Sequence, residues 1–154
     1  AEVERQAKAL EAKIMDDPDK RFVATFIGSP SMNFLRGELI EKDGKVVFTT
    51  NEVTFSLDGY HAETPLAAGR AVVLGVRPEH VRVDADILSG EVHEAVVDIE
   101  EPMGADNLIW LKHAGHTLSV RVGGHRRFSP GTKVRLGLDM TMASLFDAES
   151  EDRL

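Results

Sequence analysis

The chain has 154 residues, of which 42% are hydrophobic and 29% charged, a balance typical of one globular domain or two small lobes. Its formal net charge of −8 argues against a nucleic-acid-binding protein, because phosphate contacts require clustered Lys and Arg. It contains no cysteine, which excludes disulfides, thiolate metal sites and a cysteine nucleophile.

Two helices are predicted before residue 30. Residues 2–15 carry apolar side chains at every third or fourth position, the pattern of a helix with one narrow apolar face. Asp17 and Pro18 have the residue types of an N-cap and a first helical position, and Gly28 ends this second helix. The N-terminus has neither an initiator methionine nor the apolar segment of a signal peptide, so we expect a processed chain or part of a longer protein.

From residue 33 onward apolar residues alternate with polar ones, which predicts short strands joined by turns. Asp43-Gly44 is a strong hairpin signal, Ala114-Gly115 is predicted to be the tight turn of a second hairpin, and residues 58–69 contain the Gly and Pro of a loop. Ser89-Gly90 is predicted to separate two lobes.

The many short strands predict a mainly β fold, either one small barrel or two fused barrels. In the second half of the chain, Trp110 is expected to point into the core. The predicted strands are residues 34–41, 45–50, 53–57, 71–76, 81–85, 92–99, 108–112, 117–122 and 134–138.

The sequence is organised around residues 75–83, where a buried apolar strand runs into Arg-Pro-Glu-His and an alternating strand runs out. Pro78 fixes its own φ and favours an extended backbone at Arg77. We therefore expect Arg77, Glu79 and His80 at a rigid corner between two strands. Three interpretations are open: a ligand clamp, a partner contact and a structural turn, which is favoured because turns with paired charges are common.

The sequence contains no phosphate-binding loop. Its single Gly-Lys pair, at residues 44–45, lies in a predicted hairpin, whereas a phosphate cradle opens a helix and continues with Ser or Thr. His113, His116 and His125 lie near turns and are expected to be solvated rather than to bind a metal. We therefore expect no catalytic residue, no cofactor and no metal site.

Glu100 and Glu101 lie at a predicted break of the strand, residues 100–104. Adjacent strand residues point to opposite faces, so the two carboxylates are not expected to converge as an acid–base pair. They are predicted to be solvated acids of a bulged loop. Arg126-Arg127 is the one compact basic spot, suited to an acidic partner loop or a small oxyanion.

Four stretches together resemble one protein family. Residues 22–34 (Phe-Val-Ala-Thr-Phe-Ile-Gly-Ser-Pro-Ser-Met-Asn-Phe) are similar to the junction after the nucleotide-binding domain of maltose-type and glycerol-phosphate-type ABC importer ATPases. Residues 75–80 (Gly-Val-Arg-Pro-Glu-His) resemble the most characteristic motif of their C-terminal regulatory domain, and residues 101–106 and 145–149 resemble its later landmarks. The motifs follow the family's order and spacing, so together they are specific.

The resemblance implies an oligonucleotide/oligosaccharide-binding (OB) β-barrel of the transport-associated (TOBE) and MOP-like type, with one or two N-terminal helices. Residues 1–30 would be the helical junction to an ATPase domain that is missing here, and residues 31–154 the regulatory β domain. It also implies a cytoplasmic homodimer, peripheral to the plasma membrane, that meets membrane permease subunits through the ATPase domain and in some members receives a regulatory protein. The interface or regulatory residues expected on this basis are Arg77, Glu79, His80, Pro102, Met103, Gly104, Arg126 and Arg127.

The main hypothesis is therefore the regulatory and dimerisation domain of the ATP-binding subunit of an importer for sugars or related solutes, non-catalytic by itself. The alternative is a small-ligand sensor for an oxyanion or a saccharide, motivated by an oxyanion-binding subgroup of the family and by Arg126-Arg127. An OB-fold nucleic-acid binder is the weakest hypothesis, because it needs aromatic platforms on a basic groove. The helix at residues 2–15 departs from the family's usual lead-in.

Overall fold

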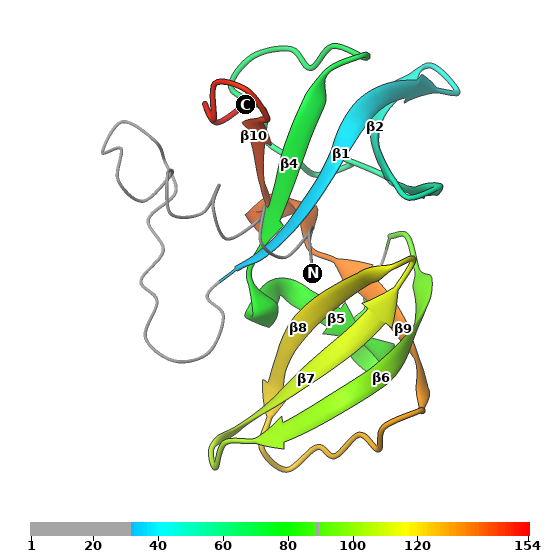
Figure 1. The fold of residues 1–154 in the computed structure, drawn as a ribbon, viewed down its shortest axis with the longest axis vertical. Helices are drawn as coiled ribbons and strands as arrows, with labels where there is room; N and C mark the ends of the chain where they lie inside the picture. The colour runs from blue at the N-terminus through cyan, green and yellow to red at the C-terminus, as the bar shows by residue number, and fades with distance from the viewer. Residues whose placement is uncertain (1–31, 89) are drawn as a thin grey trace.

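The computed structural model describes residues 32–88 and 90–154, which form two five-stranded antiparallel sheets. The first sheet, in the upper half of Figure 1, has the order β10-β4-β1-β2-β3, and the second, in the lower half, has the order β5-β9-β6-β7-β8. The strands of the first sheet are β1 (Asn33–Lys42), β2 (Lys45–Thr50), β3 (Val53–Phe55), β4 (Ala71–Val76) and β10 (Ser144–Asp147). Those of the second are β5 (Val81–Val83), β6 (His93–Pro102), β7 (Asp106–His113), β8 (His116–Gly123) and β9 (Lys133–Leu138).

The predicted mainly β fold is confirmed. Three short 3₁₀ helices accompany the strands: η1 (Pro78–His80), η2 (Asp84–Asp86) and η3 (Met140–Met142). The two predicted N-terminal helices lie outside the described residues. Within the described part of the chain, no helix has the length and apolar character needed to cross a membrane.

The two predicted hairpin turns are present. Between β1 and β2, Asp43 and Gly44 have φ values of 52° and 81°, and between β7 and β8, Ala114 and Gly115 have φ values of 49° and 80°. Two consecutive residues with positive φ form the tight turn whose twist matches that of the flanking strands. The local sequence signal therefore placed both turns correctly.

The chain passes from the first sheet to the second at η1, not at Ser89-Gly90. β4 belongs to the first sheet and β5 to the second, and the passage between them is the Arg-Pro-Glu-His corner (Figure 1). After η3 the chain returns, because β10 pairs with β4 in the first sheet. The predicted lobe boundary is wrong since Gly-containing turns mark the ends of strands, whereas sheet membership depends on pairing between distant strands.

The two sheets share one apolar core. Its fully buried members come from both sheets and include Leu39, Phe48, Leu74, Ile109 and Leu136. β5 and β8, the outer strands of the second sheet, also contact each other, so this sheet is curled into a nearly closed barrel. The shared core indicates that the sheets fold as one unit rather than as two separate barrels.

The first sheet is apolar on its other face as well. Met32, Phe34, Val73 and Phe146 form a second buried cluster there. Gly75 lies beneath it: a Cβ added to Gly75 would stand 2.7 Å from the Met32 sulfur and 3.4 Å from the Phe34 ring. The first residue of the Gly-Val-Arg-Pro-Glu-His motif is therefore small because two apolar side chains cross over it.

A β-bulge in β6 overturns several details of the predicted pattern. The register with β7 shifts between Val97 and Ile99, and Ile99 is 48% exposed although it continues the alternation of the buried Ala95 and Val97. The strand does not break at residue 100 but continues to Pro102. Trp110, which is paired with Ile99, is only partly buried, while its neighbours on β7 lie in the core. An extra residue in one strand exchanges the inward and outward faces beyond it.

The strand predicted at residues 81–85 is also shorter than expected. β5 ends at Val83, because Asp84 has a φ of 48° and begins η2. Its carboxylate accepts a hydrogen bond from the backbone N–H of Arg135, at 2.9 Å, which fixes this turn beside β9.

Candidate functional site

The Arg-Pro-Glu-His corner is held mainly by backbone contacts. Arg77 is extended, with φ −70° and ψ 149°, and its carbonyl accepts a 2.9 Å hydrogen bond from the N–H of His80. Pro78 is buried, whereas Glu79 points to the exterior. The carbonyl of His80 accepts a 3.1 Å bond from the N–H of Asp139, which joins the corner to the start of η3. These contacts favour the structural-turn interpretation.

Asp139 is the polar centre of the region beside this corner. Its carboxylate accepts from the N–H of Thr141 at 3.1 Å and from the Thr141 hydroxyl at 2.6 Å. The Arg82 guanidinium lies 3.6 Å away on the other side. The Thr141 hydroxyl, and to a smaller extent the Arg82 charge, lowers the pKa of Asp139, which therefore stays ionised.

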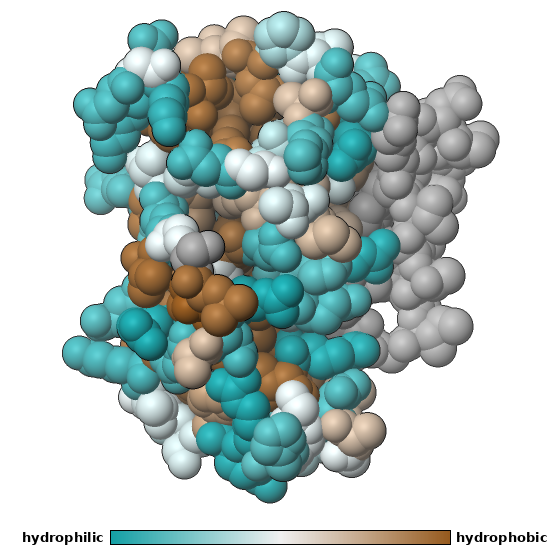
Figure 2. Space-filling model, turned by 180° about the vertical axis from the view of Figure 1, so that it is seen from behind, coloured by the Kyte–Doolittle hydropathy of each residue, from teal (hydrophilic) through white to brown (hydrophobic). Residues whose placement is uncertain are grey.

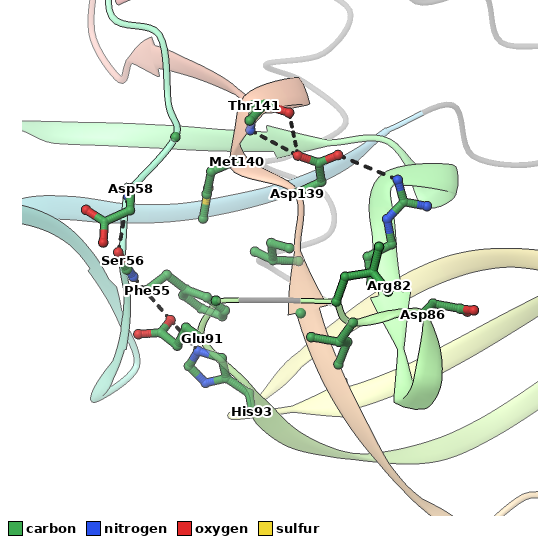
Figure 3. A pocket seen from close by; sticks show the side chains of 16 residues that line it. Phe55, Ser56, Asp58, Arg82, Asp86, Glu91, His93, Asp139, Met140 and Thr141 are labelled. Atoms are coloured by element: carbon green, nitrogen blue, oxygen red, sulfur yellow. Dashed lines mark hydrogen bonds and ion pairs between the residues drawn. The ribbon is translucent and has the colours of Figure 1, made fainter.

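A cleft of about 720 Å³ lies between the two sheets next to Asp139 (Figure 3). One wall comes from β3 and the following loop, and the other comes from η2, the start of β6, the end of β9 and η3. Glu91 bridges the walls: it accepts from the N–H of Ser56 at 3.1 Å, and its oxygen lies 2.7 Å from Nε2 of His93. The cleft is therefore closed at one side by a polar contact between the sheets.

The charges around the cleft do not suit an anion. Four carboxylates line it, and Arg82 is the cation among its lining residues. The carboxylates are those of Asp58, Asp86, Glu91 and Asp139. Each carboxylate has a basic partner: Lys45 for Asp58, Arg126 for Asp86, His93 for Glu91 and Arg82 for Asp139. An oxyanion would therefore find no unpaired arginine among the lining residues, and a neutral group fits the cleft better.

Apolar side chains stand exposed at the mouth of the cleft. Leu88 is 93% exposed and Val92 is 46% exposed. Figure 2 shows, on the face opposite that of Figure 1, an apolar area at mid-height between the lobes, surrounded by hydrophilic residues. Leu88 itself lines the cleft, and nothing in the described residues covers its side chain.

The structure brings two other predicted stretches together at the far end of the second sheet. The N–H of Gly124 donates a 2.9 Å hydrogen bond to the carbonyl of Ala105. A Cβ added to Gly124 would lie 2.2 Å from the carbonyl oxygen of Gly104, so the two loops touch backbone to backbone. The exposed turn of Pro102, Met103 and Gly104 therefore rests on the loop that leads into Arg126 and Arg127, whereas the Arg-Pro-Glu-His corner takes no part in these contacts.

Both arginines of the predicted basic spot are paired. Arg127 donates from Nη2 and Nε to Glu100 Oε1, at 3.0 and 3.2 Å. Arg126 pairs with Asp86 and lies 5.2 Å from the centroid of the Phe128 ring. The positive charge of this spot is thus largely neutralised inside the molecule, which weakens the case for a small oxyanion.

Glu100 is the centre of this network, and its expected solvation is wrong. Its side chain is only 11% exposed and accepts hydrogen bonds from Arg127, from the N–H of Phe128 and from the amide of Asn107. The bond from Arg127, followed by those from Phe128 and Asn107, lowers the pKa of Glu100 to about 2. The bulge lies between Val97 and Ile99, before the predicted break at residues 100–104, and the strand continues past it with Glu100 turned inward.

Asn107 and His116 were also missed as structural polar groups. Asn107 is fully buried and donates to Glu100 at 2.8 Å and to the carbonyl of Arg126 at 2.7 Å. His116, expected to be solvated, is 6% exposed. Across residues 32–88 and 90–154, no cluster of three or more His, Cys, Asp or Glu side chains is arranged to hold a metal ion.

Comparison with known proteins assigns both halves of this fold. Residues 28–81 match the MalK OB fold domain, and residues 74–146 match the TOBE domain. The uncharacterized ABC transporter ATP-binding protein YurJ of Bacillus subtilis is 33% identical over 98% of this chain and 42% of its own length. The sn-glycerol-3-phosphate import ATP-binding protein UgpC of Chromobacterium violaceum is 33% identical over 92% of this chain and 37% of its own length. The chain thus spans less than half the length of these relatives.

A solved structure supports the OB-like fold. The cytoplasmic molybdate-binding protein ModG, with molybdate bound, superposes with a TM-score of 0.58 over 77% of this chain and 98% of its own, at 16% sequence identity. This likeness concerns the fold alone. The two domain matches and the relatives show that the chain belongs to the family of MalK-type OB fold and TOBE domains, which form the C-terminal part of ABC transporter ATP-binding proteins.

Proposed function

We propose that this chain is the regulatory and dimerisation module of the ATP-binding subunit of an ABC importer for sugars or related solutes. The observation that carries the proposal is that the MalK OB fold and TOBE matches follow each other along one fold with a shared core. The relatives that align over nearly the whole chain are ATP-binding proteins, one of them for import of sn-glycerol 3-phosphate. Residues 1–30 would form the junction to a nucleotide-binding domain, and residues 31–154 the regulatory β domain.

In this role the module has no chemistry of its own. The sequence carries no Gly-x-x-x-x-Gly-Lys-Ser/Thr loop, and its buried polar groups serve to join loops and sheets. Two modules would hold two ATP-binding subunits together at the cytoplasmic face of the membrane. Contact with the permease subunits would pass through the nucleotide-binding domains.

The exposed turn of Pro102, Met103 and Gly104 is the surface we assign to partner contact. Met103 is 49% exposed at its tip, and the paired arginines 126 and 127 fix the loop beneath it. Arg77, Glu79 and His80 would instead set the angle between the sheets. A regulatory protein would then meet a preformed surface rather than one that orders on binding.

The proposal is tested by the mass of the chain in solution. Sedimentation equilibrium of residues 1–154, with and without residues 1–16, should show a concentration-dependent dimer in both cases. If the chain stays monomeric at high concentration, the dimerisation role is contradicted. If deletion of residues 1–16 abolishes the dimer, that role belongs to the N-terminal segment. ATP hydrolysis by the isolated chain should not exceed the buffer rate.

A second candidate, a sensor of small ligands, is favoured by one observation, the cleft of about 720 Å³ between the sheets. The pairing of Arg82, Arg126 and Arg127 with carboxylates argues against an oxyanion and leaves a saccharide as the better fit. Calorimetric titration with molybdate, tungstate, sulfate, phosphate and glycerol 3-phosphate, and separately with maltose, distinguishes the cases. Heat of binding with any of them would support the sensor over a purely structural module.

A further inference from the structure

Three histidines from three neighbouring strands of the second sheet meet the β2–β3 hairpin of the first sheet. His93 on β6 stacks on Phe55, with ring centroids 4.3 Å apart. His113 on β7 contacts the His93 ring edge-on at 5.0 Å and the Phe55 ring at 5.8 Å. His116 on β8 is paired in register with His113. We refer to His93, His113 and His116 as the histidine joint.

His116 connects the joint to β2 by hydrogen bonds. The Thr50 hydroxyl donates its proton to the carbonyl of Arg36 at 2.7 Å, so its oxygen is left to accept from His116 Nε2, at 2.9 Å. The next residue, Asn51, donates from its amide to the carbonyl of Ala114 at 3.1 Å. The end of β2 is therefore held to the β7–β8 turn by two hydrogen bonds, one of which comes from the His116 ring, a residue that is only 6% exposed.

His113 has no place for a second proton. Its Nδ1 lies 2.9 Å from the carbonyl of Glu94 and must donate to it, because a carbonyl only accepts. The other ring nitrogen, Nε2, is buried and has no hydrogen-bond partner among the described residues. Protonation would place an N–H and a positive charge at this buried position without an acceptor.

The charged groups around the histidine joint do not offset the positive charge that protonation of His113 or His116 would add. The β2–β3 hairpin presents the uncharged Thr50, Asn51 and Phe55. On the second sheet, Glu91 lies against His93, at 2.7 Å, and the carboxylate of Glu94 points instead to Lys133. Among the described residues, the charges that act on the pKa values of His113 and His116 are those of His93 and His113, respectively.

The direction of the pKa shifts agrees with this geometry. Burial lowers the pKa of His113, and the nearby His93 lowers it further, while the bond to the Glu94 carbonyl acts in the opposite direction. Burial also lowers the pKa of His116, with a further contribution from His113. Both imidazoles therefore take up a proton less readily in the closed joint than when they are exposed to water.

We propose that the histidine joint is a proton-sensitive connection between the two sheets, closed while its imidazoles are neutral and loosened when His113 and His116 take up protons. Because Phe55 and His93 also line the cleft, loosening the joint widens the cleft beside them. The device is independent of the proposed role in an importer, since it depends only on contacts within this chain.

The pH range follows from the linkage between protonation and opening. A group that binds protons more weakly in the closed state than in the open state stabilises the closed state above its open-state pKa, about 6.5 for histidine. As the pH falls below this value the closed state loses stability, until the closed-state pKa is reached. Protonation of each of the two histidines can raise the equilibrium constant for opening of the joint by up to about tenfold for each pH unit within this window.

The absence of cysteine from the chain allows a direct distance measurement. Asp58→Cys and Leu88→Cys place spin labels on opposite sides of the cleft, at side chains that are 74% and 93% exposed. We expect the label-to-label distance distribution, measured by pulsed electron paramagnetic resonance, to gain a longer component at about pH 5.5 relative to about pH 7.5.

Two variants identify the groups responsible. In His113→Gln combined with His116→Asn, whose amides can still donate hydrogen bonds but do not titrate, the distance distribution should be the same at both pH values. His61→Gln removes an exposed histidine and should leave the pH response intact. An unchanged distribution in the labelled parent at both pH values, or a shift that persists in the double variant, overturns the proposal.

If the double variant does not fold, hydrogen exchange of the unaltered chain provides a second test. Hydrogen exchange of the β2 and β3 amides should lose about tenfold or more of its protection between about pH 7.5 and about pH 5.5, after correction for intrinsic rates. The imidazole proton resonances of His113 and His116 should titrate below the ordinary histidine pKa of about 6.5. Unchanged protection of the hairpin, or titration of both histidines at the ordinary value, contradicts the joint.

Discussion

The side-chain amide of Asn33 pairs with the backbone of Ser119 in the way a neighbouring strand would, across a separation of 86 residues. Its Nδ2 donates to the Ser119 carbonyl at 2.8 Å, and its Oδ1 accepts from the Ser119 N–H at 2.8 Å and from the Ser119 hydroxyl at 3.0 Å. Both residues are buried. Since β8 is an outer strand of its sheet, this amide supplies the partners that its backbone otherwise lacks there.

Replacing Asn33 with Ala should lower the free energy of unfolding by about 3 kcal/mol, because a buried N–H and a buried carbonyl lose their partners together. Urea denaturation followed by circular dichroism measures this loss. Asn51→Ala is the matched control: it also removes an amide donor between the sheets, but at an exposed bond to Ala114, and should cost about 1 kcal/mol. If the two variants lose the same free energy of unfolding, the hydrogen bonds of Asn33 contribute no more to stability than the exposed bond of Asn51.

The elements that could be predicted from the sequence are those set by local chemistry. The Asp43-Gly44 and Ala114-Gly115 turns and most strands were placed correctly, because alternation and turn residues act over a few positions. Sheet membership was not predictable in this way. β10 joins β4 only after the whole second sheet has been formed along the chain, and no short-range pattern encodes that pairing.

In the candidate site, too, local features could be predicted from the sequence and long-range contacts could not. The resemblance identified residues 75–80 and 101–106 as important, yet it did not reveal that the first stretch carries the chain between two sheets. The sequence predicts a solvated acid at Glu100 because it predicts a loop there, whereas the strand continues to Pro102 beyond a bulge. Asn33 and His116 were missed because their partners lie far away in the sequence, on the opposite sheet.

Glu100 and its neighbour Glu101 offer a test of the buried network. Glu100→Gln keeps the shape of the side chain but places an NH₂ where donors from Arg127, Phe128 and Asn107 converge, so it should lower the urea midpoint clearly. Glu101→Gln changes the same group at an exposed position and should leave the midpoint nearly unchanged. A similar midpoint for both variants would mean that the network contributes little to stability.

The same carboxylate predicts a pH dependence with a defined sign. The pKa of Glu100 is lowered from 4.5 to about 2, so its stabilising effect is complete above pH 4.5 and is lost as the pH falls towards 2. Asp147, whose pKa is lowered to about 2 by the N–H of Ser150 and by Arg70, acts in the same direction. We expect the free energy of unfolding to fall through this acidic range, and to fall less steeply in Glu100→Gln. If the free energy of unfolding falls equally steeply with pH in the parent and in Glu100→Gln, other groups cause the acid sensitivity.

Two glycines of the first sheet should respond differently to an added methyl group. At Gly37 the new Cβ would lie 2.2 Å from the backbone carbonyl of Thr49, which cannot move without breaking the β1–β2 pairing, so Gly37→Ala should cost about 3 kcal/mol. At Gly75 the obstacle is the flexible side chain of Met32, and the loss should be about 1 kcal/mol. Thermal or urea unfolding of both variants measures the difference. A larger loss at Gly75 would mean that Met32 is held as rigidly as the backbone.

The turn assigned to partner contact can be tested with two methionines of similar exposure. Met103, at the tip of the β6–β7 turn, is 49% exposed, and Met142, in η3 beside the cleft, is 52% exposed. Replacing either with Asp should change the free energy of unfolding by no more than about 0.5 kcal/mol, since both are surface positions. If the turn lies in the dimer interface, Met103→Asp should raise the dimer dissociation constant at least about tenfold, because it places a charge in an apolar contact. Met142→Asp should leave that constant unchanged in the same sedimentation experiment, and the reverse result would move the interface to the face that carries the cleft.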